Sequence, residues 1–89
     1  MKRVFDPVFN ELIVVSPKQV ELAIYIRQFR KIHNLSQKEM AELCSLYGKD
    51  NNISFKSCEI WFYENYKRIP TKPKFQVLMN TMDITPDML

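Results

Sequence analysis

The chain of 89 residues contains a single glycine, Gly48. Glycine provides the positive backbone φ of tight hairpin turns and the close backbone approach of phosphate-binding loops. One glycine therefore excludes a glycine-rich phosphate cradle and disfavours a fold built from many β-hairpins. The length allows one small domain. With 46% hydrophobic and 26% charged residues, the composition is that of a globular protein.

Capping signals followed by apolar residues at helical spacing predict two helices in the first half of the chain. Residues 16–19 read Ser-Pro-Lys-Gln, a capping box with proline at the first helical position, and the apolar face that follows runs from Leu22 to His33. Asn34 suits the left-handed end of this helix. Residues 36–39, Ser-Gln-Lys-Glu, form a second capping box, and Gly48 suits the end of the second helix.

The second half of the chain predicts further short helices. We expect a third helix over about 56–66, a fourth from near Pro73 and a fifth turn at 85–87. Residues 16–89 then form an all-α bundle of four to five helices. Residues 1–15 are a lead-in, in which Leu12–Val15 suits a short strand.

From residue 18 to residue 89, apart from one loop, the chain resembles the helix-turn-helix domain of the Cro/phage-repressor family. The resemblance rests on Ile26–Arg30, on Leu35–Ala41 and on an ungapped stretch from Ile60 to Leu89. It implies a lambda-repressor-like fold in which Ala41 lies where the second and third helices cross. It also implies binding to double-stranded DNA, with the third helix in the major groove.

The resemblance assigns DNA-contacting roles to polar, basic and aromatic residues around the third helix. The base-reading positions, with Glu59 beside them, are Lys56, Ser57, Cys58, Trp61 and Phe62. Phosphate contacts are implied for the start of the second helix and for the end of the third: Gln37, Lys38, Asn65, Lys67 and Arg68, the last two in a basic run with Lys72 and Lys74. Arg30 and Glu64 correspond to a buried ion pair of the family, which is a structural pair and not a catalytic one.

Several of these residues also have purely structural interpretations. Gln37 fits an ordinary helix N-terminal residue, and the basic run fits a solvated face. Cys58 is either a contact or an idle exposed thiol. Cys44 is expected in the core and His33 at a helix end. One histidine and two distant cysteines do not provide a metal site.

Two departures from the family pattern concern the reading helix and the turn before it. The connection over residues 46–55 is longer than the family's tight turn and is similar to that of POU-specific domains. Trp61 and Phe62 cannot make the bidentate hydrogen bonds with which proteins read bases, although Phe62 suits a thymine methyl group. The same aromatic residues suit a protein interface.

The leading hypothesis is a sequence-specific DNA-binding regulator of phage, plasmid or antitoxin type, acting as a homodimer on a palindromic site. The alternative is a protein-interaction module that uses the aromatic face of the third helix, for example toward a toxin. The strand at Leu12–Val15 suits pairing with its twin, with a partner's sheet edge, or packing on its own core. We expect a cytoplasmic protein without membrane segment, cofactor or enzymatic activity, because the single histidine is poorly placed for a catalytic base.

Overall fold

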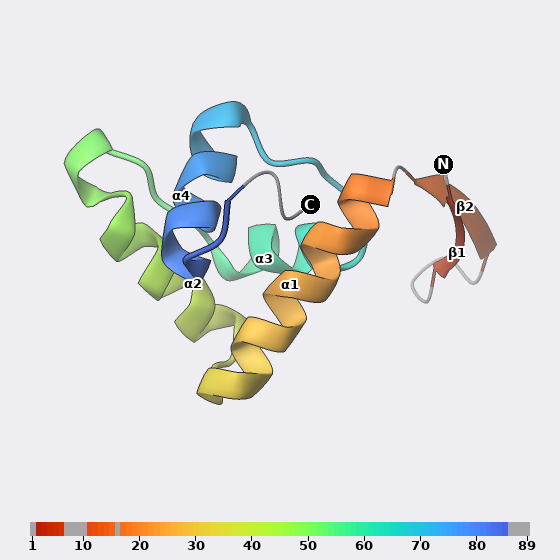
Figure 1. Cartoon of the computed structure of the whole chain (residues 1–89), viewed down its shortest axis with the longest axis horizontal. Coiled ribbons are helices and arrows are strands. Elements are labelled where there is room, and N and C mark those ends of the chain that lie inside the picture. Colours follow the sequence, from red (N-terminus) through yellow and green to blue (C-terminus); the bar gives the residue numbers. More distant parts are fainter. Residues whose placement is uncertain (1, 7–10, 16, 86–89) are drawn as a thin grey trace.

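The computed structural model describes residues 2–6, 11–15 and 17–85. In these residues a two-stranded hairpin precedes four α-helices and one short 3-10 helix, so the predicted all-α class of the helical part is confirmed. The third helix lies between the first and the second, and the hairpin extends from the start of the first helix, outside the helical body (Figure 1). Part of the predicted fifth turn, residues 86 and 87, lies outside the described residues.

The first helix, α1, spans Pro17–His33. Pro17 occupies the first helical position, as predicted; the proposed cap, Ser16, lies outside the described residues. Asn34 ends the helix with a left-handed φ of 55°, and the Leu35 N–H donates to the Arg30 carbonyl at 2.8 Å. This is the predicted helix end, in which a left-handed residue lets the next N–H satisfy a terminal carbonyl.

The second helix, α2, spans Gln37–Tyr47 and begins with the predicted capping box. The Ser36 hydroxyl accepts from the Glu39 N–H at 3.0 Å, and the Glu39 carboxylate accepts from the Ser36 N–H at 2.9 Å. The helix ends at Gly48, where a 3-10 turn, η1 (Lys49–Asn51), begins. Gly48 has a φ of −89°, so glycine is required there for space: a Cβ atom would lie 2.5 Å from the Ile53 carbonyl oxygen.

The long connection between α2 and α3 is folded back onto α2. Its Asn52 adopts a left-handed φ of 56°, and the Ile53 N–H donates to the Gly48 carbonyl at 2.9 Å. Near its end, the Phe55 N–H donates to the Ser45 hydroxyl at 2.8 Å, and the Phe55 ring is buried in the core. These contacts fix the direction in which the chain enters α3.

The third helix, α3, spans Ser57–Glu64, so the predicted range of 56–66 is wrong at its C-terminal end. Tyr66 adopts a left-handed φ of 61°, and a right-handed α-helix cannot continue through a residue in this conformation. The Asn65 side-chain amide donates to the Trp61 carbonyl at 2.9 Å and so satisfies part of the helix end. Lys56 is the N-cap residue and lies just outside the helix.

The fourth helix, α4, spans Lys72–Met82, with Pro73 in its first turn as the sequence indicates. It ends at Asp83, whose φ of 55° is left-handed. The core lies where the four helices meet, and its most buried large side chains are Ile26, Met40, Cys44, Ile60, Leu78 and Met79. Ala41 is also buried in α2, the helix that packs against α3.

The hairpin consists of β1 (Lys2–Asp6) and β2 (Glu11–Val15), which run antiparallel with Val4 opposite Ile13. The strand at Leu12–Val15 was predicted from the sequence, whereas β1 was not. In the described residues, β2 therefore pairs along one edge with β1 of the same chain.

Candidate nucleic-acid interface

The two sides of α3 differ sharply in exposure. Ser57 and Cys58 are exposed and Trp61 and Phe62 are half-buried, whereas the residues between and after them, Glu59, Ile60, Tyr63 and Glu64, are buried. Positions 57, 58, 61 and 62 repeat at helical spacing, so they share one side of the helix. The structure thus brings the predicted base-reading residues of α3 onto one solvent-facing strip, with exposed Lys56 directly before it.

Aromatic rings and one guanidinium group cover the second half of this strip. Trp61 and Phe62 meet edge to face, with ring centroids 5.6 Å apart. The Arg68 guanidinium carbon lies 4.6 Å from the centroid of the Phe62 ring, which is cation–π geometry. A positive charge is therefore held beside the aromatic end of α3 by a side chain from the following loop.

Glu59 is not available at this surface, so its predicted position beside the base-reading residues is wrong. Its carboxylate accepts from the Lys56 N–H at 3.0 Å and from the Lys74 ammonium group, and its side chain is only 11% exposed. Burial raises the pKa of Glu59, but the hydrogen bonds from Lys74 and from the Lys56 N–H, together with the positive charges of Lys74 and Arg68, outweigh it, so the net shift of the pKa is downward. Burial and the nearby Glu59 carboxylate also raise the pKa of Tyr63 to about 12.

The predicted basic run is divided by this pairing. Lys74 is bound to Glu59 and lies 5.4 Å from the centroid of the Phe55 ring, so it does not join the other bases as a solvent-facing charge. Arg68 and Lys72 are exposed and Lys67 is half-buried. The expectation of four available bases is therefore wrong for Lys74.

The predicted ion pair between Arg30 and Glu64 is present and bidentate. Arg30 Nε donates to Glu64 Oε2 at 2.7 Å and Arg30 Nη2 donates to Glu64 Oε1 at 2.8 Å; the Glu64 side chain is 3% exposed. The hydrogen bond with Glu64 raises the pKa of Arg30. Arg30 Nη1 also donates to the Leu35 carbonyl at 3.1 Å, so one guanidinium joins α1, its end and α3.

Arg27 is a second cation at the end of α3, and the sequence analysis missed it. Its Nη2 donates to the Glu64 carbonyl oxygen, and its Nε lies 3.7 Å from Glu64 Oε1. A cation at a helix C-terminus is favourable because the last carbonyl groups carry partial negative charge. The signal was present in the sequence: Arg27 lies three residues before Arg30 and so on the same flank of α1.

The phosphate-contacting residues implied for the helix ends differ in their surroundings. Gln37 is half-buried and Lys38 is exposed in the first turn of α2, where backbone N–H groups have no partner within the helix. Asn65 is half-buried, and one of its amide hydrogens is used by Trp61, as described above. Of the two cysteines, Cys44 is buried and Cys58 is exposed. His33 is the last residue of α1, and its ring centroid lies 4.3 Å from that of Phe29.

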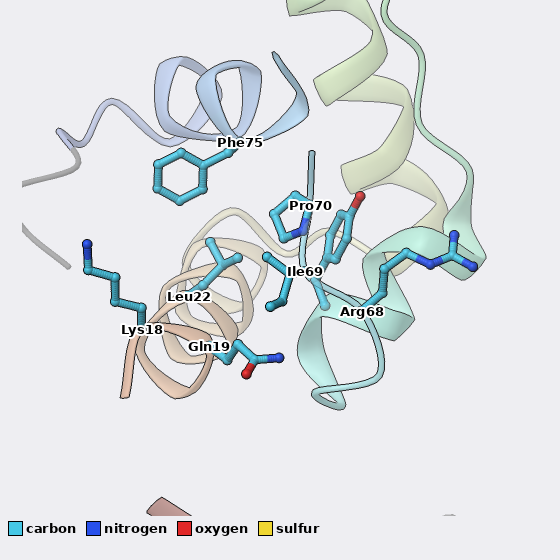
Figure 2. A pocket seen from close by; sticks show the side chains of 8 residues that line it. Lys18, Gln19, Leu22, Arg68, Ile69, Pro70 and Phe75 are labelled. Carbon is cyan, nitrogen blue, oxygen red and sulfur yellow. The ribbon is translucent and has the colours of Figure 1, made fainter. Parts of the chain in front are cut away.

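An apolar hollow of about 270 Å³ lies between the start of α1, the loop after α3 and the start of α4. The side chains of Leu22, Ile69 and Phe75 surround its space, while the charged ends of Lys18 and Arg68 lie at opposite outer edges (Figure 2). The sequence analysis did not predict this hollow. Because the Arg68 guanidinium is turned toward Phe62, the hollow is flanked by charge rather than lined by it.

Comparisons with protein-family models, with curated proteins and with solved structures found no match. Within the part of the chain that the structure describes, every helix is too short or too polar to cross a membrane.

Proposed function

We propose that this chain is a sequence-specific regulator that binds double-stranded DNA, with α2 and α3 as a helix-turn-helix and α3 in the major groove. The observation that carries the proposal is the division of α3 into a buried side and a solvent-facing strip of Ser57, Cys58, Trp61 and Phe62. The major groove, about 12 Å wide, admits an α-helix. A helix that is anchored along one side and open along the other has the form that such docking requires.

The anchoring on the buried side supports the proposal because base reading needs a helix at a fixed angle. Glu64 fixes the end of α3 to Arg30 and Arg27 of α1, and Glu59 fixes its start to Lys74 of α4. These pairs orient the helix from two neighbouring elements. Rigid support of this kind makes a recognition surface more precise than a loop would.

Basic side chains flank the strip and suit contacts to phosphate. Lys56 precedes α3, Lys67 and Arg68 follow it, and Lys38 lies in the first turn of the neighbouring α2. Phosphate contacts supply most of the affinity that is independent of sequence. The hydroxyl of Ser57 in the strip and the ammonium group of Lys56 before it suit hydrogen bonds to base edges, and Phe62 offers an apolar contact for a thymine methyl group.

A single α3 reads few base pairs, so the proposal includes a homodimer whose two copies of α3 enter successive major grooves of a palindromic site. A protein partner such as a toxin belongs to the same proposal where the chain acts as an autoregulating antitoxin.

Fluorescence anisotropy of the full chain tests the proposal. Duplexes tiled from the DNA upstream of its own gene are titrated at two salt concentrations, with a scrambled duplex as control. We expect tight binding to one tile with a steep loss of affinity at higher salt, because phosphate contacts release counterions. Equal weak binding to all duplexes, or none, contradicts a specific operator in this region.

A protein-interaction module is the second candidate, and the edge-to-face pair of Trp61 and Phe62 beside Arg68 favours it. Tryptophan and arginine are enriched among the residues that dominate protein interfaces. Phe62→Ala separates the two candidates. A DNA reader would change its preference at one base step by about 1–3 kcal/mol, whereas an interface would lose its protein partner with DNA affinity unchanged.

A further inference from the structure

We propose that an apolar face formed by α1, the end of α2 and the end of α4 is the surface through which two copies of this chain associate. Two neighbouring hollows make up this face, and they share Phe29 and Met82. The first is otherwise lined by Tyr25, Gln28, Ile32 and Ile84, and the second includes Leu43 and Tyr47. We call this surface the α1–α4 face.

Within residues 17–85, the exposed large apolar side chains lie mainly on or beside the α1–α4 face. Ile32 and Tyr47 line its two hollows and are 78% and 53% exposed. Leu46 is exposed next to Tyr47, and Ile24 is exposed two helical turns before Ile32. Among residues 17–85, only one other large apolar side chain is exposed, Ile69, which lies in the hollow of Figure 2. Exposed apolar side chains that gather in one region of a protein surface mark an interaction site.

The outer stripe of α1 fits a second copy of itself. Ile24, Gln28 and Ile32 are spaced by four residues, so they follow one line along the helix. A two-fold axis through Gln28 brings Ile24 of one copy against Ile32 of the other, and the same contact recurs on the other side of the axis. The amide of Gln28 both donates and accepts, so it can pair with its own copy. Such self-complementarity is what a two-fold interface needs.

The charge distribution also favours a second copy on this face. The lining of the first hollow contains no acidic or basic residue, and that of the second contains only His33 and Asp83 besides uncharged side chains. Contact between two such linings therefore brings few charged side chains together, although the exposed Arg27 and Lys31 lie beside the stripe on α1. The side of α3 near Lys56 and Arg68 is basic, and a two-fold contact there would bring like charges together.

The α1–α4 face is separate from the strip on α3. No residue of α3 lines either hollow. Two copies joined through this face would keep both strips open to solvent, which is the arrangement that the proposed DNA binding needs. The association itself does not rest on the proposed function; only its use on two half-sites does.

Sedimentation velocity of the full chain, with a matched pair of variants, tests the face. For the wild type at micromolar concentration, we expect sedimentation to yield a molecular mass of twice the 10.7 kDa of one chain. Ile32→Glu places a charge in the α1–α4 face. Because the Ile32 side chain is exposed, the substitution should not disturb folding. We expect a monomer with the circular dichroism spectrum and melting temperature of the wild type. Ile69→Glu, at a residue 65% exposed outside the face, should leave the dimer intact.

A cross-link tests the position of the two-fold axis. Gln28→Cys in a Cys58→Ser background leaves the buried Cys44 as the other thiol, and mild oxidation should give a disulfide-linked dimer in high yield. A monomeric wild type, or a dimer that survives Ile32→Glu without this cross-link, overturns the proposal. Anisotropy with the operator duplex separates association through the α1–α4 face from DNA binding. A wild type that is monomeric but still binds one half-site contradicts association through this face and leaves the proposed DNA binding in place.

Discussion

Two carboxylates on the inner side of α3, those of Glu59 and Glu64, are buried, and each is paired with a cation from another helix. A buried charge is tolerated only when it is paired and hydrogen-bonded. A hydrogen-bonded ion pair also requires a particular orientation of its two side chains, whereas an apolar contact is not directional. We infer that these two side chains set the orientation of α3, while the apolar side chains around Ile60 supply most of the favourable burial.

Removal of the Glu64 carboxylate should destabilise the domain. In Glu64→Ala, Arg30 loses its two hydrogen bonds to the Glu64 carboxylate and keeps only the one to the Leu35 carbonyl, with its side chain 22% exposed. We expect the free energy of unfolding to fall by about 3 kcal/mol, the lower end of the cost of breaking a buried pair. Urea unfolding followed by circular dichroism measures the change. Glu42→Ala, at an exposed position of α2, should change stability little, and equal midpoints for wild type and Glu64→Ala would contradict a structural role for the pair.

The two cysteines should differ in reactivity by their positions. Burial raises the pKa of the Cys44 thiol to about 11, and a hydrogen bond with Thr81 lowers it by less. The thiolate is the reactive form, so Cys44 should not react with Ellman's reagent at pH 8 in the native state. We expect one equivalent to react quickly, at the exposed Cys58, and a second only in denaturant. Cys58→Ser should abolish the fast equivalent; two fast equivalents in the wild type would show that Cys44 is accessible.

As an element, α3 has eight residues, too few for a stable helix in isolation. Its ends are satisfied by side chains: the Glu59 carboxylate binds the Lys56 N–H at the start, and the Asn65 amide binds the Trp61 carbonyl at the end. The remaining stability comes from packing against α1 and α2. The proposed recognition helix is therefore formed by the rest of the fold rather than by its own sequence propensity.

The Glu59 contacts should make the stability of the domain depend on pH in the acid range. The pKa of Glu59 is lower in the folded state than its usual value. A carboxyl of this kind stabilises the fold fully above its unfolded pKa of roughly 4.3, and the contribution is lost as pH falls through the lower folded pKa. Glu59→Gln should therefore cost stability at pH 7 but progressively less from about pH 5 to pH 3. Urea unfolding at several pH values tests this, with Glu42→Gln as control; a cost that is independent of pH would contradict it.

Across the whole molecule, two surfaces of different character are separated. One contains the aromatic and basic strip of α3, and the other is the mainly apolar α1–α4 face. Binding at the first should weaken steeply with salt, whereas association through the second should respond little. The two activities can thus be measured independently in the same protein.

Loss of a phosphate contact should appear in the salt dependence of DNA binding. We expect Arg68→Ala to weaken binding to all duplexes alike and to reduce the slope of log K against log salt by about 0.9, the value for one phosphate. Lys67→Ala should act in the same direction. Lys31→Ala, an exposed lysine in the last turn of α1, is the matched control and should leave the slope unchanged. An unchanged slope in Arg68→Ala would remove Arg68 from the phosphate contacts.

The sequence by itself determined the helices with strong local signals. The capping box at 36–39, the left-handed Asn34 and the all-α class followed from hydrogen bonds and apolar spacing within a few residues of each other. The Arg30–Glu64 pair was also predicted, but through a family resemblance and not through local patterns. Gly48 was predicted as a helix end, although the reason, the close approach of the Ile53 carbonyl, involves a contact across the loop.

The tertiary structure alone decided the features that depend on residues distant in the sequence. Glu59 was placed beside the base-reading residues through the family resemblance, which does not reveal that Lys74, fifteen residues later, pairs with its carboxylate on the inner side of α3. The same dependence on distant residues explains why three other features were not predicted: the early end of α3, the strand β1 and the second cation, Arg27. Capping and periodicity act within one turn of the chain, whereas charge pairing, strand pairing and surface hollows form only when separate elements are packed together.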